Sequence, residues 1–183
     1  MSKKELIVDA AIELITQNGI HNTPMSAIAK KAGTGIGTIY NYFRNKDILI
    51  NYIYVSIKKE EEYIYNAFDP NMAIKTQFET YFIATIDFFK SKPNYFKFME
   101  QLQASPLITP ESKAEGEKAI KYVGELLNKG KSDRIIKNIS NAELLMFIGG
   151  TVLSYLRWFF SSNADNTNSI SNQVTMLWDA IKD

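Results

Sequence analysis

The sequence contains no cysteine, which excludes disulfides and redox sensing by thiols and is compatible with the cytoplasm. It also contains a single histidine, His21, which follows the end of a helical pattern and is typical of a surface turn. The chain has no cysteine–histidine cluster for zinc and no glycine-rich phosphate loop, and no Ser-His-Asp set can be assembled around His21. We therefore predict no catalytic residues, no metal and no cofactor, and a protein that is not an enzyme.

Glycine and proline are sparse, with nine and five copies in 183 residues. No run of alternating β-branched residues is separated by turn residues, whereas long stretches carry apolar residues at helical spacing. Hydrophobic residues make up 45% of the chain and charged residues 22%, which is enough for a core and argues against disorder. These patterns predict an all-α fold.

Capping residues divide the chain into about nine predicted helices. We expect a head of three helices over residues 1–46 and a helical body for effector binding and dimerisation over residues 47–183. The expected helices begin near Ser2, Thr23, Ile36, Asn45, Asp69-Pro70, Pro93, Glu111, Ser140 and Ile170. The fourth is expected to reach about Ala67, with Ile48 facing inward and residues 58–62 (KKEEE) exposed to solvent, and the seventh to run from Glu111 to about Asn128.

No segment of the sequence predicts a signal peptide or a membrane helix. The first helix is polar and capped, unlike the apolar core of a signal peptide. Residues 144–160 are apolar, but they include Arg157 and two adjacent glycines and are shorter than the roughly 20 apolar residues of a typical span. We therefore expect a cytoplasmic protein that does not enter the membrane.

Charge is distributed unevenly although the net charge is only +1. Residues 1–46 hold six basic and three acidic residues, and the remaining chain holds 15 basic and 17 acidic ones. A basic amino-terminal end on a mildly acidic body favours contact with phosphates at that end.

Residues 23–46, TPMSAIAKKAGTGIGTIYNYFRNK, predict two short helices joined by a tight turn. In the second helix Ile39 and Phe43 lie one turn apart and are expected in the core, while Gly37, Thr38, Asn41 and Tyr42 fall on the opposite face. A short helix whose outer face is small and forms hydrogen bonds suits the DNA major groove. The alternative is a compact three-helix subdomain with no DNA-binding role; Tyr40 fits either reading.

The motifs of this segment resemble those of the tetracycline-repressor (TetR) family of transcriptional regulators. The resemblance covers about the first 50 residues, and beyond them only helix number, length and placement agree. The matching positions are Gly19, Thr23, Ile28-Ala29, Ala32-Gly33, residues 37–43 (GTIYNYF) and Lys46.

The resemblance implies DNA-contacting roles. It implies that Thr23 and Lys46 meet phosphates, that Gly37 allows close approach, and that Asn41 makes an amide–adenine contact. Three positions depart from the family pattern: Thr34 replaces an apolar residue, Gly35 a Ser or Thr cap, and Ile36 a polar residue. Ile36 either contacts thymine methyls or packs inward. The predicted DNA-binding residues are Thr23, Thr34, Gly35, Ile36, Gly37, Thr38, Tyr40, Asn41, Tyr42 and Lys46.

The helix over residues 144–160 is apolar nearly all round, so it must be covered on two sides. A second subunit is the natural second cover, although a wholly intramolecular core is the alternative. With the last helix it predicts a two-fold four-helix interface and a homodimer that reads a palindrome. The predicted interface residues are Leu145, Gly149, Gly150, Val152, Leu156, Phe160, Val174, Leu177, Trp178 and Ile181.

Aromatic residues concentrate in the predicted fifth to eighth helices, and the resemblance implies an effector cavity there. We expect a small apolar or aromatic effector. For any one of these residues an ordinary core role is the alternative. The candidate lining residues are Phe82, Phe89, Phe96, Met99, Gln103, Tyr122 and Tyr155.

Together these features predict a sequence-specific DNA-binding transcriptional regulator, most simply a homodimeric repressor that an effector releases from a palindromic operator in double-stranded DNA. Two other classes remain open. One is a helical protein-interaction module with a vestigial head, and the other is a small-molecule-binding or catalytic helical protein. Binding that depends on Thr38, Asn41 and Lys46 would separate the regulator from both.

Overall fold

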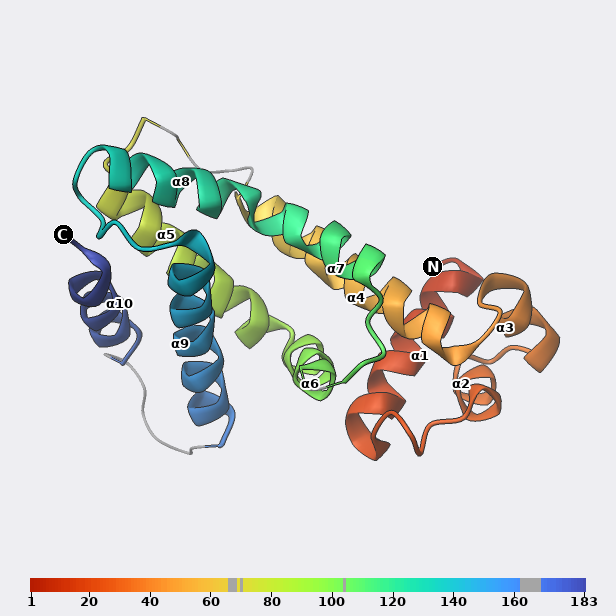
Figure 1. The fold of residues 1–183 in the computed structure, drawn as a ribbon. Helices are drawn as coiled ribbons and strands as arrows, with labels where there is room; N and C mark the ends of the chain where they lie inside the picture. The colour runs from red at the N-terminus through yellow and green to blue at the C-terminus, as the bar shows by residue number, and fades with distance from the viewer. Residues whose placement is uncertain (66–68, 70, 104, 162–168) are drawn as a thin grey trace. The chain divides into compact units, whose positions relative to one another are not determined.

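The computed structural model describes residues 1–65, 69, 71–103, 105–161 and 169–183. Within these residues it contains ten α-helices, one 3-10 helix and no strand beyond an isolated bridge between Ile136 and Lys182. The predicted all-α class is confirmed (Figure 1). The helices are α1 (Lys3–Asn18), α2 (Met25–Lys31), α3 (Ile36–Tyr42), α4 (Lys46–Tyr65), α5 (Ile74–Ser91), α6 (Pro93–Leu102), α7 (Pro110–Glu117), η1 (Lys118–Ile120), α8 (Lys121–Ser132), α9 (Asn141–Ser161) and α10 (Ser169–Ile181).

The chain divides into two compact units that are not contiguous in sequence. Unit one holds residues 1–60 and 92–118, and therefore α1 to α3, most of α4, α6 and α7. Unit two holds residues 61–91 and 119–183, and therefore α5, α8, α9 and α10. The boundary that we predicted between residues 46 and 47 stays a prediction.

Local sequence signals fix several helix ends as expected. Ser2 and Glu5 form a complete capping box at α1, and Asn45 accepts a hydrogen bond from the Ile48 amide at the start of α4. Pro93 occupies the first turn of α6, where its missing N–H costs nothing. Ser140 accepts the Glu143 amide before α9.

Other helix boundaries differ from the prediction. The predicted seventh helix is two helices, α7 and α8, separated by η1 where the chain passes from unit one to unit two. α5 begins at Ile74, after a turn in which Asp69 accepts the Asn71 amide. The predicted start at Pro70 and the predicted end of the fourth helix at Ala67 lie outside the described residues.

Two expectations about α4 are wrong. Ile48 is exposed, and Ile50 is buried in its place with Leu49 and Ile53. Glu61 is buried, so the acidic run is not a uniformly solvated face. Leu49, Ile53 and Ile57 are buried, so the apolar stripe of α4 extends to Ile50 and not to Ile48.

Unit two is built around α5, which packs against α8, α9 and α10 (Figure 1). Its inner face is aromatic and aliphatic, and the Phe78 ring lies 5.6 Å from that of Trp178 on α10. By length and composition alone α9 could cross a membrane, but core helices of soluble proteins share both properties. The buried residues of α5 are Ile74, Phe78, Tyr81, Phe82, Thr85, Ile86 and Phe89.

Two glycines of α8 give opposite predictions for the same substitution. A Cβ at Gly130 would lie 2.5 Å from Cδ1 of the buried Ile136, whereas at Gly124 the nearest atom would be 3.9 Å away. Gly124→Ala should therefore raise the free energy of unfolding by about 1 kcal/mol through helix propensity. Gly130→Ala should lower it by about 1–2 kcal/mol because overpacking outweighs that gain. Urea unfolding of the two variants measures both, and equal shifts would contradict the packing assigned to Gly130.

Candidate DNA-binding surface

The carboxyl end of α1 is a junction for the head of unit one. The last carbonyls of a helix lack partners within it. Here the Gly19 amide donates to the Ile15 oxygen at 2.8 Å, and the Thr23 hydroxyl donates to the Gly19 and Leu14 oxygens at 2.8 and 3.3 Å. Lys46 Nζ at the start of α4 donates to the Ile20 oxygen at 2.8 Å. The loop between α1 and α2 is thereby fixed to the end of α1 and to α4.

This geometry corrects the expected role of Thr23. Thr23 is 1% exposed and its hydroxyl donates inward, so it does not present that hydroxyl to a phosphate. Pro24, not Thr23, occupies the cap position of α2, where no side chain caps the helix. Lys46 is half-buried with its ammonium on the Ile20 carbonyl, which leaves further N–H donors on the same group.

The turn between α2 and α3 is a Schellman motif. Gly33 has φ +64°, the Gly33 amide donates to the Lys30 oxygen, and the Thr34 amide donates to the Ala29 oxygen at 3.0 Å. A side chain at position 33 would be strained in this left-handed conformation. The turn therefore sets the direction in which α3 begins, at Gly35, which caps α3 without a side chain.

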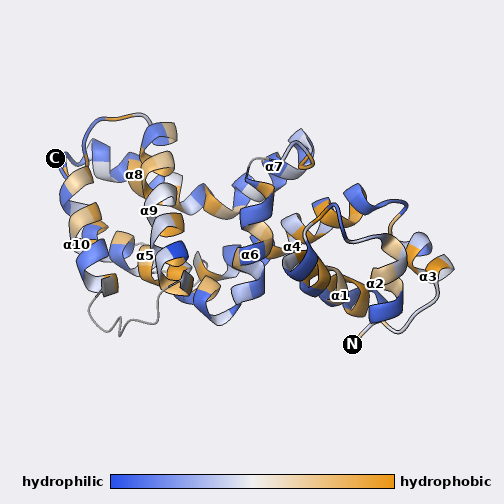
Figure 2. Cartoon of the chain, turned by 90° about the horizontal axis from the view of Figure 1, so that it is seen from below, coloured by the Kyte–Doolittle hydropathy of each residue, from blue (hydrophilic) through white to orange (hydrophobic). Residues whose placement is uncertain are grey.

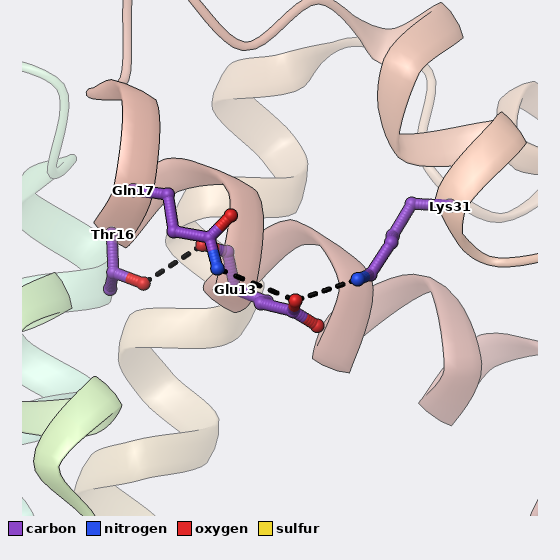
Figure 3. Close-up of polar contacts among 4 residues, drawn as sticks. All are labelled: Glu13, Thr16, Gln17 and Lys31. Carbon is purple, nitrogen blue, oxygen red and sulfur yellow. Dashed lines mark hydrogen bonds and ion pairs between the residues drawn. The ribbon is translucent and has the colours of Figure 1, made fainter.

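An ion pair fastens α2 to α1 from the outside. Lys31 Nζ lies 2.6 Å from Oε1 of Glu13, and Gln17 Nε2 donates to the same oxygen (Figure 3). The hydrogen bond from Lys31 lowers the pKa of the Glu13 carboxyl. Both side chains are well exposed, so the pair adds orientation more than stability.

The inner side of α3 is fixed by burial. Ile39 and Phe43 are fully buried, as the sequence predicted. The Phe43 ring lies 5.3 Å from that of Tyr52 on α4, and Lys4 Nζ lies 3.8 Å above the Tyr52 ring. Lys4 thus braces the start of α4 from α1 by a cation–π contact. In the sequence Lys4 counts only toward the basic charge of residues 1–46, because no local pattern indicates its aromatic partner.

The outer side of α3 is open to solvent. Ile36, Tyr40 and Tyr42 are 46%, 50% and 45% exposed, and Asn41 and Gly37 are exposed as well. Apart from the chain neighbours and the backbone of α3, no atom of the described residues lies within 4 Å of a Cβ placed on Gly37. Ile36 therefore does not pack inward, which resolves the alternative left by the sequence. The structure brings the predicted residues Gly35, Ile36, Gly37, Tyr40, Asn41 and Tyr42 to one exposed helix, with Thr34 and Thr38 half-buried beside them.

The predicted effector residues fall in both units. Phe96, Met99 and Gln103 belong to unit one. Phe82, Phe89, Tyr122 and Tyr155 belong to unit two, where all but Tyr122 are buried. Tyr122 is well exposed and Gln103 is exposed, so neither is enclosed as a lining residue would be.

Most of the predicted interface residues are buried within their own chain. Because this burial requires no partner subunit, the face of α9 and α10 that we predicted for the dimer interface belongs instead to the core of unit two. Leu145, Gly149 and Phe160 are half-buried and Gly150 is exposed. The residues buried in the single chain are Val152, Leu156, Val174, Leu177, Trp178 and Ile181.

A different stripe of α9 and α10 is apolar and exposed. Met146 is 72% exposed and Met176 56%, and Phe147 and Trp158 are also exposed. Hydrophobic residues are visible along both helices in Figure 2. Beside Trp158, an open depression of about 680 Å³ is lined by Ser154, Tyr155, Trp158, Asn172, Gln173, Thr175 and Met176.

Comparison with known proteins agrees with this architecture. Residues 7–53 match the bacterial regulatory proteins of the tetR family, and residues 53–183 match the tetracyclin repressor-like C-terminal domain. The second match alone covers more than half of the chain. The protein belongs to the TetR family of DNA-binding transcriptional regulators.

Individual relatives support the same assignment. The fatty acid metabolism regulator protein of Bacillus subtilis is 59% identical over 46 residues, which is 25% of this chain and 24% of that protein. A TetR family transcription regulator from Shewanella has the same fold, with a TM-score of 0.91 over all of both chains at 20% identity. The regulator FadR of B. subtilis, solved with stearoyl-CoA, has a TM-score of 0.76 at 24% identity over 95% of this chain and 96% of that one.

Proposed function

We propose that this regulator is a homodimeric repressor that binds a palindromic operator through α3 and leaves it when an effector binds. The observation that carries the proposal is the exposed outer face of α3 on a helix whose inner face and preceding turn are fixed. Such a helix can enter the major groove without rearranging. The DNA contacts we assign are those predicted from the sequence, except that Thr23 contributes its backbone position and not its hydroxyl.

Chemistry on the face assigns roles within the site. The Asn41 amide can donate to and accept from adenine, and the Ile36 side chain can contact thymine methyls. Tyr40, Tyr42 and Lys46 can donate to phosphates, which position the protein without reading sequence. An exposed isoleucine on an otherwise polar face favours an operator with thymine at that position.

Selection of bound duplexes from a random DNA pool, over a salt series, tests this proposal. We expect a palindromic motif and a Kd that rises with salt. The slope of log Kd against log salt concentration should increase with the number of phosphate contacts. Asn41→Ala should weaken binding to the selected duplex by about 1–3 kcal/mol and relax base preference at one position of each half-site. The measurement is fluorescence anisotropy with matched and mismatched duplexes.

The control for that variant is Asn22→Ala, which removes an exposed amide of the same unit that bonds only to the Asn18 carbonyl. It should leave the operator Kd unchanged. If only weak binding without a motif is found, and it persists after unfolding and refolding to remove any bound effector, the helical interaction module becomes the better reading.

The exposed stripe on α9 and α10 supports the dimer. Its apolar side chains repeat at helical spacing. Apart from the chain neighbours and the backbone of α9 itself, no atom of the described residues lies within 4 Å of a Cβ built on Gly149 or Gly150. Two glycines in mid-helix cost about 2 kcal/mol relative to alanines. A second copy of this helix lying close against them would offset that cost. We therefore assign the interface to Met146, Phe147, Gly150, Trp158 and Met176.

Met146→Glu should weaken dimerisation by about tenfold or more, because a carboxylate would be buried between the subunits. Sedimentation equilibrium over a concentration series measures this. Met72→Glu changes an exposed methionine that lies outside α9 and α10, and it should leave the dimer intact. A monomeric wild-type chain at all concentrations, or equal behaviour of the two variants, would contradict this interface.

We propose that the effector is a small molecule whose apolar part is held by the aromatic interior of unit two. Phe82, Phe89 and Tyr155 lie in that interior. The name of the B. subtilis relative and the stearoyl-CoA bound by FadR make a fatty acyl thioester the first compound to test. Effector binding lowers operator affinity by the ratio of its affinities for the two states. As a regulator that acts on DNA, the protein would work in the cytoplasm.

Stearoyl-CoA should weaken operator binding by about fivefold or more, the lower end of typical coupling. Free coenzyme A is the matched control, because it carries the polar part without the acyl chain, and it should have no effect. Anisotropy titrations of the preformed complex measure both. Equal release by coenzyme A alone would contradict an apolar effector, and release by neither would exclude acyl thioesters.

A further inference from the structure

The segment over residues 92–118 is part of the DNA-reading unit, although it follows α5 in sequence. It contains α6, α7 and the loop between them, and it groups with residues 1–60. Its two ends are joined covalently to unit two, through α5 before it and η1 after it. What fastens this segment to the head therefore decides whether changes elsewhere in the chain reach α3 through it.

One fastening is a buried amide on α4. Asn51 is 9% exposed, and its Nδ2 donates to the Leu107 oxygen at 2.8 Å and to the Asp47 oxygen at 2.9 Å. Its Oδ1 accepts from the Thr109 amide at 2.9 Å. Thr109 in turn caps α7 by accepting from the Ser112 amide. Asn51 thus holds the loop and the first residue before α7 at once.

A second fastening runs from α6 to the carboxyl end of α1. Gln101 Nε2 donates to the Ile15 oxygen at 2.9 Å, and the two helices pack against each other. Ile15 lies in the same junction whose carbonyls bind Thr23 and Lys46. Side chains of the α1–α2 loop, α4 and α6 therefore all donate to the backbone of one short stretch.

These bonds form a closed circuit. Lys46 joins α4 to the α1–α2 loop, Asn51 joins α4 to the α6–α7 loop, and Gln101 joins α6 to α1. All three side chains donate to backbone carbonyls, so α6 cannot shift relative to α1 unless one of these bonds breaks. Tighter packing at Gly116, where a Cβ would lie 2.7 Å from the Tyr54 hydroxyl, holds α7 against α4.

We propose that Gln101 and Asn51 are positioning residues that couple the α6–α7 segment to the recognition helix, so that DNA binding at α3 and the state of residues 92–118 influence each other. This inference rests on the proposed function. Coupling between two sites is reciprocal, so operator DNA bound at α3 should stabilise the segment, which lies outside the DNA contacts assigned above. The effector need not be known for this to be measured.

Hydrogen exchange of the full chain, with and without the selected duplex at saturation, tests the inference. In the wild type, operator binding should slow amide exchange of residues 101–113 by about fivefold or more. Gln101→Met keeps the length of the side chain and loses the donor. It should still bind the duplex at saturation but lose most of that slowing. Asn51→Asp removes the donor to Leu107 and should act in the same direction.

Gln17→Met is the matched control, because it removes the same amide from an exposed position of α1 without touching α6. It should keep the wild-type response. A merely structural role for Gln101 would change basal exchange but not the change that DNA causes. Bound DNA with no slowing at residues 101–113, or the same slowing in Gln101→Met, overturns the inference alone. Failure to find any specific duplex would instead overturn the proposed function, and this inference with it.

Discussion

The backbone carbonyls at the carboxyl end of α1 and in the loop that follows it are the constraint around which unit one is built. Glycine ends the helix at position 19 with φ +85°, and the chain turns away before its last carbonyls are satisfied within the helix. Thr23 in the following loop, Lys46 on α4 and Gln101 on α6 supply donors to this stretch. Each donor fixes the position of its own segment, so hydrogen bonding here determines how these segments are placed.

Contacts at its start, its inner side and its end explain why α3 can be short. A seven-residue helix has little stability of its own. It is held because the Schellman turn at Gly33 fixes its start, burial of Ile39 fixes its inner side, and Phe43 against Tyr52 fixes its end. Because its outer residues are not needed for packing, their identities can suit contact with DNA. An exposed isoleucine at position 36, which contributes nothing to the core, is consistent with such a choice.

How much the sequence could predict depended on the distance over which each signal acts. Capping residues, the tight turn and the motif over residues 37–43 are local, and they located the fold class, several helix starts and the exposed face of α3. Thr23, Gln101 and Asn51 bond to residues at separations of four to 86 positions, so the motif gave Thr23 the wrong partner and no pattern indicated the other two. α9 is apolar on two faces, either of which could have been the core. Only the packing against α5 shows which one is the core.

The division into two non-contiguous units has a consequence for regulation. Three chain passages join the units, at residues 60–61, 91–92 and 118–119. On the side of unit one these passages are tied to one another, because Glu60 binds Lys92 and Tyr95 while Glu115 binds Lys59 and Lys118. A displacement at one passage is therefore shared by the others and not absorbed by a single linker. If α4 moved alone, these ties would have to break. Their presence favours movement of α4, α6 and α7 together with the reading head.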